Sequence, residues 1–546
     1  MRRALATAAC AAALCSADLG RPEGLRSTVH AAGADHTTPA AGDADAWWAH
    51  VTFLASDALQ GRATGSPGYG RAAAYVAAEF RKAGLEPAGT AGFMQRVAFK
   101  TRQIDEARSR LSLSRDGRIV PLTLGEDANV SLRVEPAPEV DAPLVFVGRG
   151  LHIPERHIDD LEGLNLKGAV VVYLAGTPPS LPSALQAHFG SAAERWRAYH
   201  DAGAVGTIAI ANPKRVEVPW SRSTAQRLQP AMSLADPSLD QYPGQRLAIT
   251  MNPAHANLLF DGSGHTFDEL LELDDAGAAL PRFALPARVS ARIAVTHGRL
   301  ASQNVAGILR GADPVRRREY VVVSAHLDHL GVGSPVNGDA VYNGAMDNAS
   351  GVAAILEVAA RLHASGERPA RSLLFLAVTG EEEGELGSRY FAAHPTVPPH
   401  ALIADVNTDM FLPLFPLKEL LVLGLDESDL GGDIRDVAGT MHVHVQADPE
   451  PQRNRFIRSD QYSFIQAGIP ALAMKVGYEP GSPDAAIAAR WTAERYHAPS
   501  DDLQQPVDHE AAGAFVEVVR RLAVRIANRA TRPAWNDTSF FARFSR

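Results

Sequence analysis

The sequence predicts an α/β protein whose main sheet carries helices on both faces. From Ala301 onward, strand-length apolar runs alternate with amphipathic helical patterns, beginning with "REYVVVSAH" and "NASGVAAILEVAARLHASG". These strands are apolar almost throughout, which is typical of strands that are buried on both faces. A group of short β-rich runs, "APLVFVGRG", "KGAVVVYLAG" and "AGAVGTIAI", precedes them. We therefore expect a larger α/β layer and a separate, smaller α/β module.

Length and composition limit the classes of function. A chain of 546 residues is expected to form two or three domains. Its hydrophobic content of 46%, with 45 Gly and 36 Pro, is typical of a globular protein that is rich in loops. The net charge of −9 argues against nucleic acid or an anionic membrane as the main partner. No segment after the N-terminal leader is apolar for long enough to predict a membrane span.

Residues 1–32 are predicted to form a signal peptide and a flexible leader. Two arginines precede an apolar run, Ala4 to Ser16, that is too short to span a bilayer. Cleavage after Ala17 and cleavage near Ala31 remain open, and the alternative interpretation is a disordered cytoplasmic leader. We expect export to the periplasm or to the extracellular medium.

Both cysteines of the chain, Cys10 and Cys15, lie in this leader. Neither follows a convincing lipoprotein pattern. Once the leader is removed, the chain has no thiol, so disulfides, thiolate metal ligands and a cysteine nucleophile are excluded.

The ordered part is expected to begin near residue 45. Within "RAAAYVAAEFRKAGLEP" the apolar residues recur at helical spacing, and Gly84 is placed to end that helix. We assign residues 45–130 and 291–530 to one catalytic domain and residues 131–290 to the inserted module. Residues 531–546 are expected to form a C-terminal tail.

Groups that can bind a metal occur at or just after successive strands. In an α/β sheet, ligands gather where the strands end. His326 ends "YVVVSAH", and Asp328 is placed to accept a hydrogen bond from its ring. The other groups are Asp347, a glutamate of the cluster 381–383, Asp409 and His497.

Each group also has a purely structural interpretation. Asp347 is placed to be a helix N-cap. Thr379 to Glu382 matches a capping box. Asp409 is compatible with a turn, and His497 with an exposed loop. The joint occurrence of all five groups at strand ends favours the functional interpretation.

Two histidines and three carboxylates without a thiolate suit zinc, cobalt or manganese. Five ligands are too many for one catalytic zinc and enough for two ions that share a bridging carboxylate. The cluster "GEEEGE" after an apolar strand fits this prediction, because carboxylates in a cleft need cations to neutralise them. One glutamate can bind metal while its neighbour acts as a general base.

The motifs together resemble the dinuclear zinc aminopeptidase family, which includes bacterial leucyl aminopeptidases and, more distantly, glutamate carboxypeptidase II and the transferrin receptor. The matching pieces are "AHLDHLG", "NGAMDNASG", "TGEEEGELGS", "NTDM" and "YHAPSDD", in the family's order. "LASDALQGRATGSPG" and "SDQYSFIQAGIPALAM" also match, so the resemblance covers most of residues 47–530. The middle module resembles the protease-associated domain that many members carry.

The resemblance implies a mixed, mostly parallel central sheet flanked by helices, with the protease-associated domain inserted. It also implies two Zn²⁺ per chain, with Co²⁺ or Mn²⁺ as substitutes. One ion would be bound by His326 and Asp409, the other by Glu382 and His497, and Asp347 would bridge both. The peptide bond after Asp347 is expected to be cis.

By the same resemblance, Glu381 would be the general base and Asp328 would support His326. A shift of one residue along the triple glutamate is the alternative, but it would leave Gly384 and Gly387 out of register. Two positions depart from the family pattern: Glu385 replaces an apolar residue, and Tyr462 follows "SDQ".

The implied function is hydrolysis of the first residue from peptides with a free N-terminus. A carboxypeptidase or dipeptidase on the same metal pair is the alternative, with Arg453, Arg455 and Arg458 as an arginine patch. A glutaminyl-cyclase-like acyltransferase would not need His326 and Asp409. A receptor that has lost its metal ligands is disfavoured because all five groups are present. The oligomeric state does not follow from the sequence.

Overall fold

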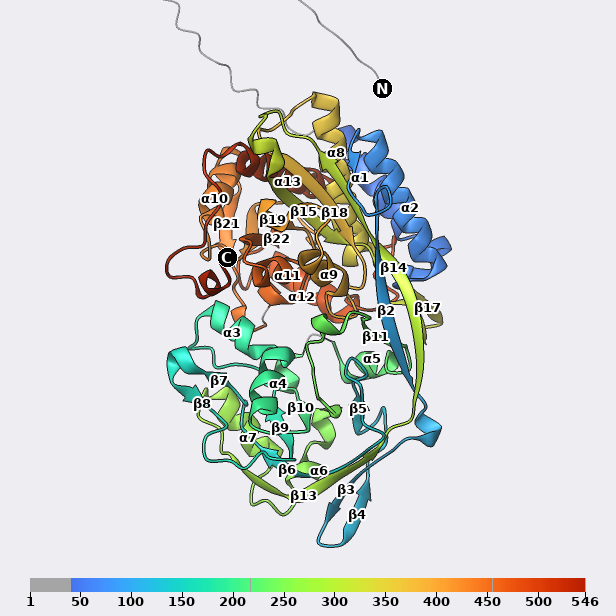
Figure 1. Ribbon diagram of the computed structural model, residues 1–546, viewed down its shortest axis with the longest axis vertical. Coiled ribbons are helices and arrows are strands. Elements are labelled where there is room, and N and C mark those ends of the chain that lie inside the picture. The colour runs from blue at the N-terminus through green and yellow to red at the C-terminus, as the bar shows by residue number, and fades with distance from the viewer. Residues whose placement is uncertain (1–40, 217, 454, 546) are drawn as a thin grey trace, which may run out of the picture. The chain divides into compact units, whose positions relative to one another are not determined.

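The computed structural model describes residues 41–216, 218–453 and 455–545. Two main sheets with their helices make up this part of the chain (Figure 1). The predicted signal peptide, with both cysteines, lies outside the described residues. None of the helices described combines the length and hydropathy that a bilayer span requires.

The larger sheet has ten strands. They are β1 (Glu86–Pro87), β2 (Met94–Ile104), β11 (Ala231–Leu234), β14 (Val295–Leu309), β15 (Tyr320–His326), β18 (Ser372–Val378), β19 (Leu402–Asn407), β20 (Glu419–Leu423), β21 (His444–Ala447) and β22 (Ala471–Gly477). Their order is β11-β2-β14-β18-β15-β19-β22-β20-β21, with β1 paired to β14. The four strands from β18 to β22 run parallel, and the strands from β14 to β11 are antiparallel. The predicted mixed α/β fold is therefore confirmed, with its parallel part at the centre.

Helices bury both faces of this sheet, as the continuous apolar strands predict. Along β15, Val321 and Val323 face one core and Val322 faces the other. The first core includes residues of α1 (Ala41–Leu54), α2 (Pro67–Lys82), α8 (Ser350–Ser365), α10 (Leu430–Thr440) and α13 (His509–Asn528). The second includes residues of α9 (Leu386–Ala393) and α11 (Gln461–Gln466). The predicted helix before Gly84 corresponds to α2.

The smaller sheet has eight strands, in the order β4-β3-β13-β6-β9-β10-β12-β5. They are β3 (Arg110–Arg115), β4 (Arg118–Pro121), β5 (Ala128–Val130), β6 (Glu139–Phe146), β9 (Val170–Leu174), β10 (Gly206–Ile210), β12 (Leu247–Met251) and β13 (Phe283–Arg292). The helices in this stretch are α3 (Ser183–Gly190), α4 (Ala192–Asp201), α5 (Trp220–Ala225), α6 (Asn257–Phe260) and α7 (Phe267–Asp275). Two further sheets are hairpin-like pairs, β7 (His152–Ile153) with β8 (Ile158–Asp159), and β16 (Gly331–Val336) with β17 (Asp339–Tyr342).

The chain exchanges strands between the two sheets. Residues 110–130 join the smaller sheet although the predicted module begins at residue 131, and β11, from within that module, joins the larger sheet. Two long strands, β2 and β14, lead out of the larger sheet and toward the smaller one (Figure 1). We call residues 105–294 the inserted segment; their description as a separate domain stays a prediction.

Candidate metal centre

The predicted ligands lie beyond the carboxyl ends of the parallel strands, where such sheets place their sites. β15 ends at His326, and Asp409 follows the end of β19 by two residues. β18 ends at Val378, and Glu381 and Glu382 occupy the turn between it and α9. Three neighbouring strands thus bring these side chains to one edge of the sheet.

Asp347 enters the same place from the N-terminal side of α8. It lies in a π-helical turn, Ala345–Ala349, and the peptide bond between it and Asn348 is cis, as the resemblance implies. The buried carboxylate of Asp501 accepts hydrogen bonds from the backbone N–H groups of Met346, at 2.9 Å, and Asp347, at 3.0 Å. These bonds fix the turn from which the Asp347 side chain projects.

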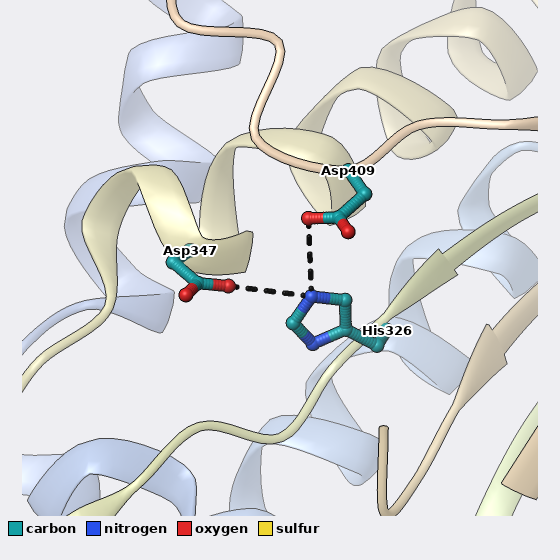
Figure 2. A group of neighbouring side chains, drawn as sticks. All are labelled: His326, Asp347 and Asp409. Atoms are coloured by element: carbon teal, nitrogen blue, oxygen red, sulfur yellow. Dashed lines mark hydrogen bonds and ion pairs between the residues drawn. The ribbon is translucent and has the colours of Figure 1, made fainter. Parts of the chain in front are cut away.

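His326, Asp347 and Asp409 form a first group of metal-binding atoms (Figure 2). His326 Nε2 lies 3.4 Å from Asp347 Oδ1 and 3.3 Å from Asp409 Oδ1. Figure 2 shows the two carboxylates directed at the same ring nitrogen from different elements. One imidazole nitrogen and two carboxylate oxygens are therefore aimed at a common point.

A second group uses the other oxygen of the same aspartate. His497 Nε2 lies 3.3 Å from Asp347 Oδ2 and 3.3 Å from Glu382 Oε2. His497 follows α12 (Pro483–Glu494) and adopts a left-handed backbone conformation, with φ of 55°. Because its two oxygens face the two groups, Asp347 is placed as a bridge between them.

A third histidine, His329, reaches the second group and was not identified from the sequence. Its Nδ1 lies 2.7 Å from Glu382 Oε1 and 3.8 Å from Asp347 Oδ2, so it can also complete a three-ligand set. We keep His497 as the candidate ligand because it is equidistant from both carboxylates, as His326 is in the first group. His329 instead makes an ordinary hydrogen bond to Glu382. In the sequence, the signal that could have identified His329 is its place as the second histidine of "AHLDH".

The prediction that the Asp328 carboxylate accepts a hydrogen bond from the His326 ring is wrong. His326 Nδ1 lies 3.2 Å from the backbone carbonyl oxygen of Asp328. The alternation of an extended strand does not extend to Asp328, because β15 ends at His326. The Asp328 carboxylate instead accepts hydrogen bonds from the N–H of Glu381, at 3.2 Å, and from Thr64 Oγ1, at 3.0 Å.

In each of the two groups, neighbouring carboxylates raise the pKa of the histidine. Burial alone would lower the pKa of His326, but Glu381, Asp347 and Asp409 raise it well above its usual range. Burial likewise opposes protonation of His497, yet Glu382 and Asp347 raise its pKa to about 10. Negative charge around both histidines therefore outweighs the effect of their burial.

The carboxylate of Glu381 is unlike that of Glu382. Burial, with the negative charges of Glu382 and Asp409 and against the opposing charge of His326, raises the pKa of Glu381 well above that of an ordinary glutamate. A second carboxyl group in the site, Asp460, is fully buried, and burial with neighbouring Asp409 raises its pKa to about 7, against the effect of His326. Raised pKa values of this kind mark groups that can accept and return a proton.

The donor set fits a pair of divalent cations. Asp347 and Asp460 are buried, and Glu381, Glu382 and Asp409 are half-buried. The three imidazoles of the site cannot neutralise five carboxyl groups, and burying unpaired carboxylates is costly. Imidazole nitrogen and carboxylate oxygen, without thiolate, are ligands typical of zinc and its catalytic relatives. His326, Asp347 and Asp409 would hold one ion, and Asp347, Glu382 and His497 the other.

A cavity of about 550 Å³ opens beside this centre. Asp409 and Met410 form part of its wall, together with apolar side chains such as Leu412, Phe415 and Tyr478. Arg453, Arg455, Arg458 and Lys475 also line it. Arg453 and Arg455 form ion pairs with Glu450, at 2.8 Å and 2.7 Å.

Comparisons with known proteins point to peptidases. Residues 304–523 match peptidase family M28. A probable zinc metalloprotease of Pyricularia oryzae is 44% identical over 90 residues, which span 16% of this chain and only 17% of that protein.

Solved structures are similar over most of the chain. An aminopeptidase from Aneurinibacillus sp. strain AM-1 is 19% identical, with a TM-score of 0.53, over 90% of this chain and 95% of that one. BSAP, a zinc aminopeptidase from Bacillus subtilis, is 18% identical, with a TM-score of 0.46, over 88% and 94% of the two chains. At this identity the first similarity shows the fold of the chain.

Proposed function

We propose that the protein is an exported, zinc-dependent aminopeptidase, because residues 304–523 match peptidase family M28. The observation that carries the proposal is Asp347, whose two carboxylate oxygens face two different groups, each with histidine and a further carboxylate. This arrangement supports two metal ions sharing one bridging ligand. The fold it shares with the Aneurinibacillus aminopeptidase supports the exopeptidase assignment.

In the proposed site, His326 and Asp409 hold one zinc ion, Glu382 and His497 hold the other, and Asp347 contacts both. Two zinc ions in these positions would polarise the carbonyl of the peptide bond and lower the pKa of a shared water molecule. Co²⁺ and Mn²⁺ prefer similar ligands and are expected to substitute.

Glu381 is the general base of the proposed mechanism. Its carboxylate takes a proton from the attacking water and returns the proton to the nitrogen of the leaving amine. Burial raises the pKa of Glu381, which suits both steps because the group must hold the proton between them. Asp328 positions Glu381 by accepting the hydrogen bond of its backbone N–H.

The cavity beside Asp409 is proposed to take the side chain of the first residue. Leu412, Phe415 and Tyr478 are among its lining residues, which supports peptides that begin with a large apolar residue such as leucine. The free α-amine of such a peptide would lie near the carboxylates of the centre.

Carboxypeptidase or dipeptidase activity is the second candidate, and one observation favours it. The arginines at positions 453, 455 and 458 do line the cavity next to Asp409, where they would meet a substrate carboxylate. Arg453 and Arg455 pair with Glu450, which satisfies part of that charge, so the aminopeptidase remains the first proposal.

Turnover of blocked and unblocked substrates separates the two candidates. We expect zinc-loaded protein to release p-nitroaniline from leucine p-nitroanilide and not from its N-acetylated form. Cleavage of N-acetylated dipeptides with a free C-terminus, without cleavage of the free amine substrate, would instead establish the second candidate.

Glu381→Gln tests the general base. The amide cannot accept the proton, so kcat is expected to fall about 10²- to 10⁴-fold. Both metal ions should stay bound, because Glu381 is not one of the proposed ligands. A Glu382→Gln variant is the matched comparison and should lose metal as well as activity. Glu381→Gln protein that keeps wild-type kcat would remove Glu381 from the mechanism.

A further inference from the structure

Two arginines of the inserted segment reach backbone carbonyl groups beside the candidate ligands. Arg133 Nη2 donates a hydrogen bond of 2.7 Å to the carbonyl oxygen of Glu382. Arg222, in α5, donates from Nη1 to the carbonyl of Tyr496 at 2.5 Å and from Nη2 to that of Ala493 at 2.7 Å. Tyr496 directly precedes His497, so each arginine holds the main chain at or next to a ligand.

The third glutamate of the triplet also contacts the inserted segment. Glu383 Oε2 accepts a hydrogen bond of 3.1 Å from the backbone N–H of Met232, in β11. Gly384, the next residue, packs against Arg133, since a Cβ added there would lie 3.4 Å from Arg133 Nη1. The turn carrying Glu382 is therefore held from both sides by residues 133 and 232.

The other candidate metal position is held by different residues. The buried Arg62 guanidinium donates to the carbonyl of Leu327, next to His326, at 3.0 Å. Asn348 Nδ2 donates to the carbonyl of Thr408, next to Asp409, at 2.9 Å. Arg62 and Asn348 both belong to the part of the chain that surrounds the larger sheet.

We propose that Arg133 and Arg222 are positioning residues that set the metal affinity of the Glu382–His497 position and leave that of the His326–Asp409 position unchanged. This inference rests on the proposed two-metal function. An arginine bound to a carbonyl fixes the orientation of the peptide unit, and hence of the ligand side chain beside it. Metal binding then loses less conformational entropy, because the ligand is already oriented. Mutation of residues that orient metal ligands typically lowers metal affinity 10- to 100-fold.

The inserted segment therefore completes one of the two metal positions. The two arginines contribute through main-chain carbonyls, so their role does not appear in any ligand motif. Loss of these contacts should convert a two-metal centre into one that retains a single ion at low metal concentration.

Calorimetric titration with Co²⁺ tests this inference on the full chain after removal of metal with a chelator. Wild-type protein is expected to bind two ions. Arg133→Ala and Arg222→Ala should each weaken one of them about 10- to 100-fold and change the other by less than about twofold. Arg133→Lys and Arg222→Lys should restore part of the loss, because a lysine can still donate to the carbonyl. The visible absorption of bound Co²⁺ reports each step independently of turnover.

Arg282→Ala is the matched control. Arg282 Nη1 also donates to a carbonyl, that of Asp159 at 2.7 Å, but both residues lie inside the inserted segment. Its removal should leave both Co²⁺ affinities at the wild-type level. Equal thermal midpoints of the stripped proteins would show that the arginine variants are folded.

Single-position variants show which ion is affected. In a His326→Ala background, Arg133→Ala and Arg222→Ala should still weaken the remaining Co²⁺ site; in a His497→Ala background, they should not. Unchanged affinities, equal losses at both positions, or a loss confined to the His326–Asp409 position would each overturn the inference. Wild-type protein that binds two ions without aminopeptidase turnover would reject the proposed activity and leave this inference standing. Binding of fewer than two ions would overturn both.

Discussion

Asp328 contacts the turn that carries both Glu381 and Glu382. Its fully buried carboxylate accepts the N–H of Glu381 at 3.2 Å, the N–H of Glu382 at 3.4 Å and the hydroxyl of Thr64 at 3.0 Å. A single side chain thus orients the proposed base and a proposed ligand. At the scale of one residue, the orientation of this turn depends on a carboxylate with two acceptor oxygens that together serve three donors.

Asp328→Asn replaces one of those acceptors with an amide N–H₂ that faces other donors. We expect kcat to fall about 10- to 100-fold, because the turn loses its fixed orientation. Thr64→Val is the control, since it removes one neutral donor to the same carboxylate and should cost less than about 10-fold. Steady-state kinetics on leucine p-nitroanilide measures both. An Asp328→Asn enzyme with the kcat of the wild type would show that the carboxylate does not position the turn.

At the scale of the element, the first turn of α8 allows close approach of two loops. A Cβ added to Gly351 would lie 2.3 Å from Asn348 Oδ1 and 2.3 Å from the carbonyl oxygen of Thr408. The same Asn348 side chain accepts the N–H of Gly351 and donates to Thr408, one residue before Asp409. The absence of a side chain at Gly351 therefore lets the turn of Asp347 meet the loop of Asp409.

Gly351→Ala should lower the free energy of unfolding by about 1–3 kcal/mol, because the added methyl group overpacks a buried contact. Thermal unfolding followed by circular dichroism gives the change. Gly432→Ala in α10 is the matched control: no atom lies within 4 Å of its added Cβ, and alanine should stabilise that helix by up to about 1 kcal/mol. Equal midpoints for the two variants would contradict the steric argument.

The spacing of apolar residues in the sequence predicted the strands and the helix that carry or adjoin the ligands. The strands ending at His326 and Val378 are continuous apolar runs, and the helix after Asp347 shows its spacing in the sequence. Because parallel strands place their carboxyl ends together, His326, Glu382 and Asp409 could be predicted to converge. Asp347 precedes α8 and His497 follows α12, so strand ends alone do not explain their positions. That they bind metal stays a prediction until ions are measured.

Contacts between distant segments could not be predicted in this way. Arg133 and Glu382 are 249 positions apart, and Arg222 and Tyr496 are 274 apart. Their bonds run to main-chain carbonyls, which leave no residue pattern. The Asp328 bond was mispredicted for a related reason, because the strand geometry on which it relied ends two residues earlier.

At the scale of the whole molecule, His188 links the inserted segment to the larger sheet. Its Nδ1 lies 2.7 Å from the Tyr462 hydroxyl group of α11, and rings of Phe540 and Phe544 pack around it. Burial lowers the pKa of His188 to about 4, and the positive charges of Arg543 and Arg197 add to this effect. Glu194 Oε2 lies 3.5 Å from His188 Nε2, but burial outweighs that carboxylate, so the folded interface favours a neutral imidazole.

This preference predicts a loss of stability in acid. The unfolded chain protonates His188 near its usual pKa of about 6.5. Between about pH 6.5 and pH 4, the unfolded state thus binds one proton more than the folded state, and stability falls as the pH falls. The full effect is on the order of 3 kcal/mol.

Chemical denaturation at pH 7 and pH 4.5 measures the effect as a difference between variants. His188→Gln should lose less stability than the wild type on acidification. His152→Gln, which alters a histidine that is 44% exposed in the same segment, should lose as much as the wild type. Equal losses in all three proteins would rule out His188 as the cause.

The pairing of β2 with β14 has a consequence for the order of folding. Their register runs from Met94 opposite Val305 to Ile104 opposite Val295, so residues 105–294 form one closed loop between the paired strands. Closing a disordered loop of that length costs about 5 kcal/mol of chain entropy before any contact is made. The smaller sheet folds within the loop and brings its ends together, with the N–H of Asp105 bonded to the carbonyl of Ala294 at 2.9 Å. The chain should therefore assemble from its middle outward, and the catalytic edge of the larger sheet should be completed last.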